Sequence, residues 1–462
     1  MPMTALHEIL QSAGVGPPEA GQLEIRGADP VLPLRYRIGT AGAASLGALG
    51  LAVSRLWALR TGRHQRVTVD ARAAAVSLRS ARYLRINGKP LPGAWDPLSG
   101  FYQVRDGGWI SIHCNFAHHR AAALGVLGVE EDRKLADQAA LAWDGVALED
   151  AIHARGGCAG FVRNEEQWAL HPQAQAVALQ PLFEITRIGG APPEPLPEGD
   201  RPLSGIRVLD LTRVLAGPTC GRCLAEHGAD VLKITASHLP DSGQVELDTG
   251  IGKLSARLDL RAADGAATLR SLVRDADVFS QSYRPGALGA RGFSPEALAA
   301  LRPGIVCVSL SAWGITGPWS GRRGFDSIVQ AVSGIAHASG GAAKPRLLPV
   351  SAIDYVSGYL MAFGAMVALE RRAREGGSWL VRVALARVGK WIVDRGLVAK
   401  DAYAGLPEDL PKEELLPLLM EVDAPDGRIR HLGPIIELSE TPGRWTRPPV
   451  PLGHHPPVWP AR

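Results

Sequence analysis

Five short apolar segments, separated by stretches suited to helices, follow one another between residues 206 and 311. The strand-like segments are 206–211, 229–234, 255–260, 277–280 and 305–310. Helical segments are expected from Pro218 and over 263–274 and 295–301. Alternation at this spacing predicts a parallel sheet covered by helices. We therefore expect an α/β fold with a Rossmann-like sheet, in which ligands bind beyond the carboxyl ends of the strands.

A proline-rich segment over 191–202 divides the chain. Proline at this density cannot continue a helix or a central strand, so the segment should be an extended linker. Before it, 100–104 and 109–113 predict a β-hairpin followed by helices, which indicates a smaller α+β domain. The expected organisation is an N-terminal helix with a helix-turn-strand segment (1–90), the small domain (91–190), the linker (191–204), the Rossmann-like domain (205–390) and a C-terminal tail (391–462).

The composition excludes several classes of protein. Hydrophobic residues make up 46% of the 462 residues, charged residues 21%, and the net charge is +4. This is ordinary for a globular protein and too mild for a nucleic-acid partner, although a small polyanionic ligand is compatible. The first 20 residues do not resemble a secretory signal, and Arg55 and Arg60 interrupt the longest apolar run. We expect no membrane partner and a cytoplasmic location.

Cysteine and histidine clusters do not indicate a metal site. Cys220 and Cys223 have the spacing of a redox or metal pair, but no second pair accompanies them. Residues at i and i+3 share one helix face, so we expect packing cysteines. His113, His118 and His119 have no carboxylate pattern nearby, so solvated or packing histidines are expected.

The sequence contains an internal repeat. Residues 44–69 align without a gap to 358–383 at an offset of 314 residues. The offset pairs Leu46 with Leu360, Gly50 with Gly364, Gly62 with Gly376 and Val67 with Val381. Both copies read as helix, tight basic turn and strand, which favours duplication over chance similarity. The same offset pairs Thr40 with Asp354, so only the second copy carries a carboxylate.

Asp354 stands at the start of a helix rich in small residues, 350–359. The positive end of the helix dipole should keep this carboxylate ionised. Its position suits either an N-cap or a nucleophile. The turn after the first strand, 212–218, is not a Gly-x-Gly-x-x-Gly fingerprint, and no phosphate-binding Gly-Lys-Ser/Thr motif occurs. A dinucleotide-dependent enzyme or a nucleoside triphosphatase is therefore disfavoured.

Six segments in a fixed order carry a resemblance to a known family. They are 205–218, 228–234, 252–260, 283–286, 309–318 and 324–326, and they lead up to Asp354. Together they resemble the family III CoA-transferases, which include formyl-CoA, carnitine and bile-acid CoA-transferases. In that family the sheet domain precedes the small domain, whereas here the order is permuted. We interpret the chain as a fusion of two partial copies. Because family members form interlocked dimers, the resemblance also implies a possible homodimer.

The resemblance implies that Asp354 is the nucleophile. The protein would transfer coenzyme A between a small-molecule acyl-CoA and a carboxylic acid through aspartyl–acyl anhydride and aspartyl-CoA intermediates. No permanently bound cofactor is expected, because coenzyme A enters as the acyl-CoA substrate. Main-chain N–H groups of the loop 314–317 are candidates for oxyanion stabilisation.

The resemblance also implies a set of CoA-binding residues. These are Arg213, Leu215 and Ala216 after the first strand, then Ser282, Tyr283 and Arg284, and finally Arg291, beside the position (Ala290) of a basic contact in the family. Two positions depart from the family pattern: Thr235 replaces an expected glutamate and Leu254 an expected arginine.

Two other functions remain open. Acyl-CoA racemases and isomerases share the fold and need a proton-shuttling histidine, which would fall at Phe325. A hydrocarbon ring cannot move protons, so this activity is disfavoured. A degenerate CoA-fold subunit that binds without turnover is favoured by Thr235, Leu254 and the permuted order, and disfavoured by Asp354.

Overall fold

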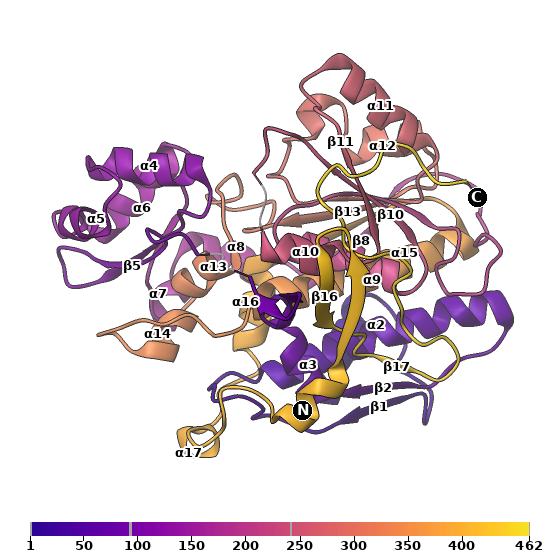
Figure 1. Ribbon diagram of the computed structural model, residues 1–462, viewed down its shortest axis with the longest axis horizontal. Helices are drawn as coiled ribbons and strands as arrows, with labels where there is room; N and C mark the ends of the chain where they lie inside the picture. Colours follow the sequence, from indigo (N-terminus) through magenta and orange to yellow (C-terminus); the bar gives the residue numbers. More distant parts are fainter. Residues whose placement is uncertain (1, 92–94, 241–242, 462) are drawn as a thin grey trace.

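The seven-stranded sheet at the centre of the protein confirms the expected α/β architecture. The computed structural model describes residues 2–91, 95–240 and 243–461 (Figure 1). The strand order is β11-β10-β9-β12-β13-β14-β8. The strands are β8 (Phe183–Gly189), β9 (Arg207–Leu211), β10 (Asp230–Thr235), β11 (Lys253–Arg257), β12 (Val278–Gln281), β13 (Val306–Ser311) and β14 (Ser378–Ala384). All neighbouring pairs in this sheet are parallel except β14 with β8.

The chain reverses its direction across the sheet beside β9. It runs from β9 outward to β10 and β11, then returns to β12 on the other side of β9. Ligands of open α/β sheets bind in the crevice at such a switch point, beyond the carboxyl ends of the strands. The topology therefore predicts a ligand site at the loops that follow β9 and β12.

Helices cover both faces of the sheet, because the strand side chains alternate between two hydrophobic clusters. Val208 and Val278 belong to the cluster that includes α9 (Ala216–Glu226) and α15 (Ala352–Glu375). Leu209 and Phe279 belong to the opposite cluster, with α11 (Ala263–Arg274) and α12 (Pro295–Leu301). Figure 1 shows α11 and α12 on one side of the sheet and α9 on the other.

The two repeat copies form equivalent elements. Helix α2 (Ile38–Thr61) has the same length as α15, and both of its ends are shifted by 314 residues from those of α15. The strands β2 (Val67–Asp70) and β14 end in register, and α3 (Ala71–Ser77) and α16 (Leu385–Val393) begin in register. A Cβ atom added to Gly50 would lie 2.5 Å from Val67 Cγ1, and one added to Gly364 would lie 2.6 Å from Val381 Cγ1. Each helix thus crosses its strand through the same glycine–valine contact.

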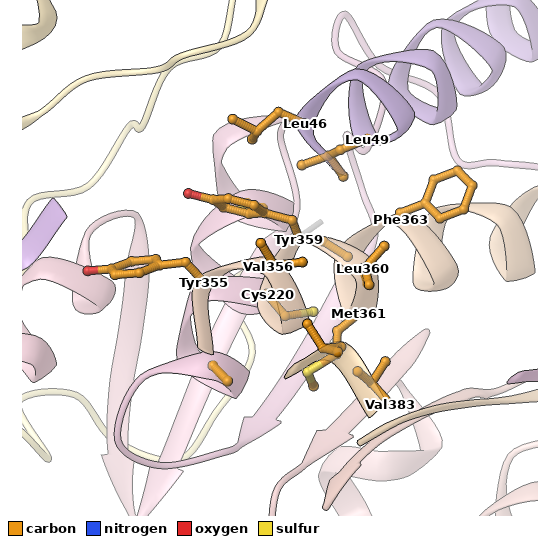
Figure 2. Packing of buried hydrophobic residues seen from close by; sticks show 14 of the residues in the cluster. Leu46, Leu49, Cys220, Tyr355, Val356, Tyr359, Leu360, Met361, Phe363 and Val383 are labelled. Atoms are coloured by element: carbon orange, nitrogen blue, oxygen red, sulfur yellow. The ribbon is translucent and has the colours of Figure 1, made fainter. Parts of the chain in front are cut away.

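Helices α2 and α15 pack against each other in the core, where Leu46 and Leu49 lie beside Tyr359 (Figure 2). Both helices are long and apolar enough to cross a membrane, which the argument from Arg55 and Arg60 missed. The most apolar window is 78% buried in α2 and 100% buried in α15. Arg55 also forms an ion pair with Glu370 of α15 at 2.7 Å. The two apolar helices thus pack as core helices.

The N-terminal segment and the tail share two small sheets. One contains β1 (Leu23–Arg26), β2 and β17 (Glu437–Leu438). The other contains β15 (Leu419–Ala424), β16 (Gly427–Leu432), β3 (Arg85–Ile86) and β4 (Lys89–Pro90). Strand β8, which the sequence assigned to the small domain, is an edge strand of the large sheet. The chain divisions inferred from composition are therefore joined by shared sheets.

The small domain contains the expected hairpin and has its own core. Its sheet has the order β5 (Gly100–Gln103), β6 (Trp109–Ile112), β7 (Ala159–Phe161), and it is covered by α4 (Ala117–Leu127), α5 (Arg133–Ala140) and α6 (Gly145–Ala154). These helices lie at one end of the molecule (Figure 1). The other helices are α1 (Pro2–Ser12), α7 (Glu165–Ala169), α8 (Pro172–Ala178), α10 (Gln244–Gly250), α13 (Asp326–Val332), α14 (Ile335–Gly340), α17 (Lys400–Tyr403) and α18 (Lys412–Leu415), with short 3-10 turns at Ser80–Tyr83, Gly289–Arg291 and Leu416–Leu418.

Candidate active site

Asp354 lies in the first turn of α15 and is 8% exposed. Its carboxyl group accepts no hydrogen bond from any described residue, so it does not cap the helix. The cap is Asp326, the first residue of α13. Its Oδ2 accepts hydrogen bonds from the main-chain N–H groups of Ile353 at 3.0 Å and Asp354 at 3.1 Å. Of the two roles that the sequence left open for Asp354, the N-cap belongs to another residue.

The surroundings of Asp354 favour its protonated form. Burial, together with the negative charge of Asp326, raises the pKa of Asp354 well above its usual range. Burial also raises the pKa of Asp326 to about 6, although hydrogen bonds from Gln330 and the α15 main chain oppose the shift. The expectation that the helix dipole keeps Asp354 ionised is therefore wrong: burial and the charge of Asp326 favour the protonated form, and Asp326 accepts hydrogen bonds from two of the N–H groups at the start of the helix. A carboxylate formed at Asp354 is poorly solvated and therefore reactive.

Asp354 lines two neighbouring cavities, of about 440 Å³ and about 910 Å³. Four other residues line both of them: Phe116, Val214, Leu215 and Phe325. Phe116 comes from the small domain, and the other three come from loops of the sheet domain. One chain thus supplies both walls of the space around Asp354.

The smaller cavity lies at the carboxyl ends of β9, β12 and β13, where the topology places the switch point. It brings together seven of the eight predicted site residues: Asp354, Arg213, Leu215, Ala216, Ser282, Tyr283 and Arg284. Arg322 and Arg323 also line it. Arg322 is paired with Asp150 at 2.6 Å, whereas Arg284 and Arg323 make no ion pair within the described part of the chain. The cavity is therefore strongly cationic.

The loop after β9 is held in an unusual conformation. Val214 has φ 68°, a left-handed value that is strained for a β-branched residue. The preceding Arg213 donates its main-chain N–H to Ser282 Oγ at 3.1 Å, and its guanidinium group donates to the Pro240 carbonyl at 2.9 Å. The same guanidinium group lies 5.6 Å from the ring centre of Phe116. Backbone strain of this kind is concentrated at functional sites.

Two further sequence predictions find no support in the geometry. Arg291 lines neither cavity, and its guanidinium group donates to the Leu260 carbonyl at 3.1 Å. The loop 314–317 faces a separate cavity of about 280 Å³, in which Gly314 and Ile315 take part but Asp354 does not. The main-chain N–H of Gly314 donates to Ser311 Oγ at 3.1 Å. The loop is therefore not positioned as an oxyanion donor for Asp354.

The histidine cluster lies at the site, which the sequence did not predict. His113 lines the larger cavity and stacks on Phe325 with ring centres 4.0 Å apart, while His118 and His119 line the smaller one. Burial lowers the pKa of His113 to about 4 and that of His119 to about 3, so both are neutral at pH 7. His113 Nδ1 and both ring nitrogens of His119 are buried without a partner among the described residues. The stacking joins residues far apart in the chain, so spacing could not reveal it.

No group of three or more histidine, cysteine or acidic residues suited to a metal ion occurs in the described ranges. Cys220 and Cys223 are buried in α9, and burial raises the pKa of both thiols. Lys253, beside the divergent Leu254, is 1% exposed and donates to Asp210 Oδ2 at 2.7 Å. This lysine is therefore engaged within the protein and is not free to bind a ligand.

Residues 203–417 match the family model described as CoA-transferase family III. Among curated proteins, the chain is 36% identical over 200 residues to acetyl-coenzyme A transferase nodX from Hypoxylon pulicicidum, which covers 42% of this chain and 34% of that protein. It is 34% identical over 201 residues to succinyl-CoA–D-citramalate CoA-transferase from Chloroflexus aurantiacus, which covers 40% of this chain and 49% of that protein. The family resemblance seen in the sequence is thus confirmed.

The chain spans half or less of the length of these two relatives. A third relative matches differently: the acyl-CoA transferase from Gibberella moniliformis is 26% identical over 490 residues, covering 89% of this chain and 85% of that protein. That alignment includes residues on both sides of the proline-rich linker. The arrangement of the N-terminal part before the sheet is therefore shared with another protein.

Proposed function

We infer, because residues 203–417 belong to CoA-transferase family III, that the protein transfers coenzyme A between an acyl-CoA thioester and a carboxylic acid with Asp354 as the nucleophile. The position of Asp354 between two cavities of different character carries this proposal. One cavity is cationic, and the other has a mixed lining in which about half of the residues are apolar. A carboxylate that passes CoA from one acid to another must reach both the CoA thioester and the acids.

We assign coenzyme A to the smaller cavity. Arg284 and Arg323 offer guanidinium groups free of ion pairs with described residues, and CoA carries three phosphate groups. Tyr283 supplies an aromatic ring suited to the adenine. The location beyond the ends of β9 and β12 is where sheets of this kind bind nucleotides. The thiol end of CoA would then reach Asp354, where the two cavities meet.

The reaction needs only acyl transfers. An oxygen of Asp354 attacks the thioester carbon, the C–S bond breaks, and the CoA thiolate leaves a mixed anhydride. The thiolate then attacks the aspartyl carbon, which releases the donor acid and forms aspartyl-CoA. The acceptor carboxylate repeats the sequence in reverse, forming a second anhydride and then the new acyl-CoA. No water or cofactor is consumed, and exclusion of water protects both anhydrides from hydrolysis.

One chain supplies residues of both domains to this site. Phe116 of the small domain and Asp354 of α15 line the same cavities. The names of the two relatives specify acetyl-CoA for one and succinyl-CoA with D-citramalate for the other. Those substrates belong to those proteins.

A specific observation favours proton exchange as the second candidate function. Phe325 stands where a racemase would have its histidine, yet His113 stacks directly on Phe325 and lines the cavity with Asp354. A neutral imidazole with a free Nδ1 could exchange a proton at the acyl α-carbon. Deuterium incorporation from D₂O into the acyl group, without transfer to an added acid, would support this function over CoA transfer.

Trapping of the acyl-aspartate tests the main proposal. The protein is incubated with acyl-CoA thioesters and hydroxylamine, and peptides are analysed by mass spectrometry. We expect a hydroxamate at Asp354 and none in an Asp354→Ala variant that still binds CoA. Thr40→Ala is a matched control, because Thr40 occupies the equivalent position in α2 and is 2% exposed. CoA transfer at the normal rate in Asp354→Ala would overturn the proposal.

A further inference from the structure

We propose that the larger cavity selects monocarboxylic acids with a bulky apolar body, such as long-chain, branched or polycyclic acids, over short dicarboxylic acids. This inference rests on the proposed function, since it concerns the acid that receives or donates CoA at Asp354. It goes beyond that function by naming the class of acid. Three features of the cavity support it: its size, the chemistry of its walls and the state of its buried cation.

The cavity is large for a small acid. Its volume of about 910 Å³ lies near the top of the range of about 300–1,000 Å³ for ligand sites. At about 30 Å³ per water, it would hold on the order of thirty waters. A four-carbon diacid has eight heavy atoms and would leave most of this space filled with solvent. An acid with a large body would instead displace that water.

About half of the lining residues are apolar, and they come from separate parts of the chain. Trp95 and Phe116 belong to the small domain, Leu247 to α10, Leu347 to the loop before α15, and Leu452 to the C-terminal tail. An apolar acyl group that fills the cavity would leave water for these surfaces, and binding would strengthen with each added carbon. The C-terminal tail therefore contributes to substrate selection.

A second carboxylate would find no free buried cation among the described residues that line the cavity. Arg79 is the buried arginine of the lining, 4% exposed, and its guanidinium group is already used. It forms an ion pair with Asp409 at 2.6 Å and donates to the Glu408 carbonyl and to Tyr83 Oη. A buried anion without a partner is strongly unfavourable. Discrimination against diacids follows from this satisfied arginine.

Two other arginines lie on the lining but are exposed. Arg82 and Arg257 make no ion pair within the described part of the chain. In contact with solvent they can attract anions toward the cavity, but such solvated pairs add little binding energy. Their position is consistent with an entrance for the acid, while the apolar walls select its body.

Acceptor series with the wild-type protein test this selection. CoA transfer is measured from one donor thioester to acetate, butyrate, succinate, octanoate and a bicyclic aromatic acid. We expect kcat/KM to rise at least tenfold from butyrate to the larger acids, and to be lower for succinate than for butyrate. Transfer confined to succinate and other short acids would overturn the inference and leave the proposed function standing.

Variants that fill the cavity sharpen the test. Leu347→Trp and Leu452→Trp place an indole on two separate walls. Each should lower the ratio of kcat/KM for octanoate, and for the bicyclic acid, to that for acetate at least tenfold. Ile315→Trp is the matched control, since Ile315 is 48% exposed and lines a different cavity. Equal losses for acetate and octanoate would count against the inference.

A binding measurement separates the inference from the proposed reaction. Calorimetric titration of the Asp354→Asn protein with octanoate should give saturable binding that weakens at least tenfold in the Leu347→Trp background. Binding without transfer in the wild type would remove the proposed function but keep the cavity assignment. Absence of octanoate binding, in a protein that still binds CoA, would overturn the cavity assignment.

Discussion

Asp326 accepts a hydrogen bond from the main-chain N–H of Asp354 at 3.1 Å, so one aspartate holds the helix on which the other stands. The first repeat copy has the same arrangement. Asp29 accepts from the main-chain N–H groups of Gly39 at 2.8 Å and Thr40 at 2.7 Å, and these two residues are the equivalents of Ile353 and Asp354. Both copies thus keep the capping carboxylate, while only the second copy has the carboxylate that faces the cavities.

The charge of Asp326 should set the acid limb of the activity profile. Attack requires ionised Asp354, whose pKa is raised by burial and by Asp326, so activity should increase as pH rises through that pKa. Asp326→Asn keeps an oxygen to accept the two hydrogen bonds but removes the charge. We expect the acid limb of kcat/KM to move to lower pH. The measurement is the pH–rate profile from pH 4.5 to 9.

Asp29→Asn is the control for that profile, because Asp29 caps α2 in the same manner but does not line the cavities. It should leave the acid limb in place. An unchanged limb in Asp326→Asn as well would show that Asp326 acts only as a cap.

Removal of the Asp354 charge should stabilise the protein in a pH-dependent way. A carboxyl group with a raised folded-state pKa binds its proton more tightly in the folded state, so stability falls as pH rises toward and through the folded-state pKa. Asp354→Asn should therefore increase the free energy of unfolding by about 1–3 kcal/mol at pH 8 and much less at pH 4.5. Thermal unfolding at both pH values checks this difference. A gain of equal size at both would argue against an ionised, buried Asp354.

The glycine–valine crossings should be intolerant of one added methyl group. Gly364→Ala would bring a Cβ to 2.6 Å from Val381 Cγ1, with its next contacts in ordinary range, and should destabilise the protein by about 1–3 kcal/mol. In the Val381→Ala background, Gly364→Ala should cost much less stability, because the smaller side chain leaves room for the added Cβ. At Gly50 the added Cβ also meets Ile436 at 2.9 Å, so Val67→Ala should rescue Gly50→Ala less completely. Denaturant unfolding of the single and double variants measures the coupling energy of each glycine–valine pair.

The large sheet could be predicted from the sequence because its signals are local. The five expected strands correspond to β9–β13 within a few residues, since buried parallel strands are apolar runs between turns. The repeat was readable too, because α2 and α15 keep one offset along their whole length. The capping role of Asp29 could not be predicted from the repeat. The loop between Asp29 and α2 differs in length from the segment between Asp326 and α15, so the offset of 314 residues does not pair the two aspartates.

The residues around Asp354 were predictable only in part. The turns after β9 and β12 are contiguous motifs, and the residues that the resemblance implied there line the smaller cavity: Arg213, Leu215, Ala216, Ser282, Tyr283 and Arg284. His113, Asp326 and Leu452 reach the same space from three distant segments, and their meeting depends on packing of the small domain and the tail. Arg291 is adjacent in sequence to the position of a basic contact in the family, but its side chain does not reach the cavity.

The contrast between Arg284 and Arg291 gives a direct test of where CoA binds. Arg284 lines the smaller cavity and has no ion pair with a described residue, whereas Arg291 donates to a carbonyl outside it. Arg284→Ala should therefore weaken CoA binding about tenfold, because a charge-assisted contact to phosphate contributes about 1.5–3 kcal/mol. The loss should shrink in high salt, since screening reduces the wild-type interaction. Arg291→Ala should leave the Kd of CoA within about twofold. The Kd values are measured by calorimetry at low and high salt. Equal Kd values for the two variants would show that CoA does not bind in the smaller cavity.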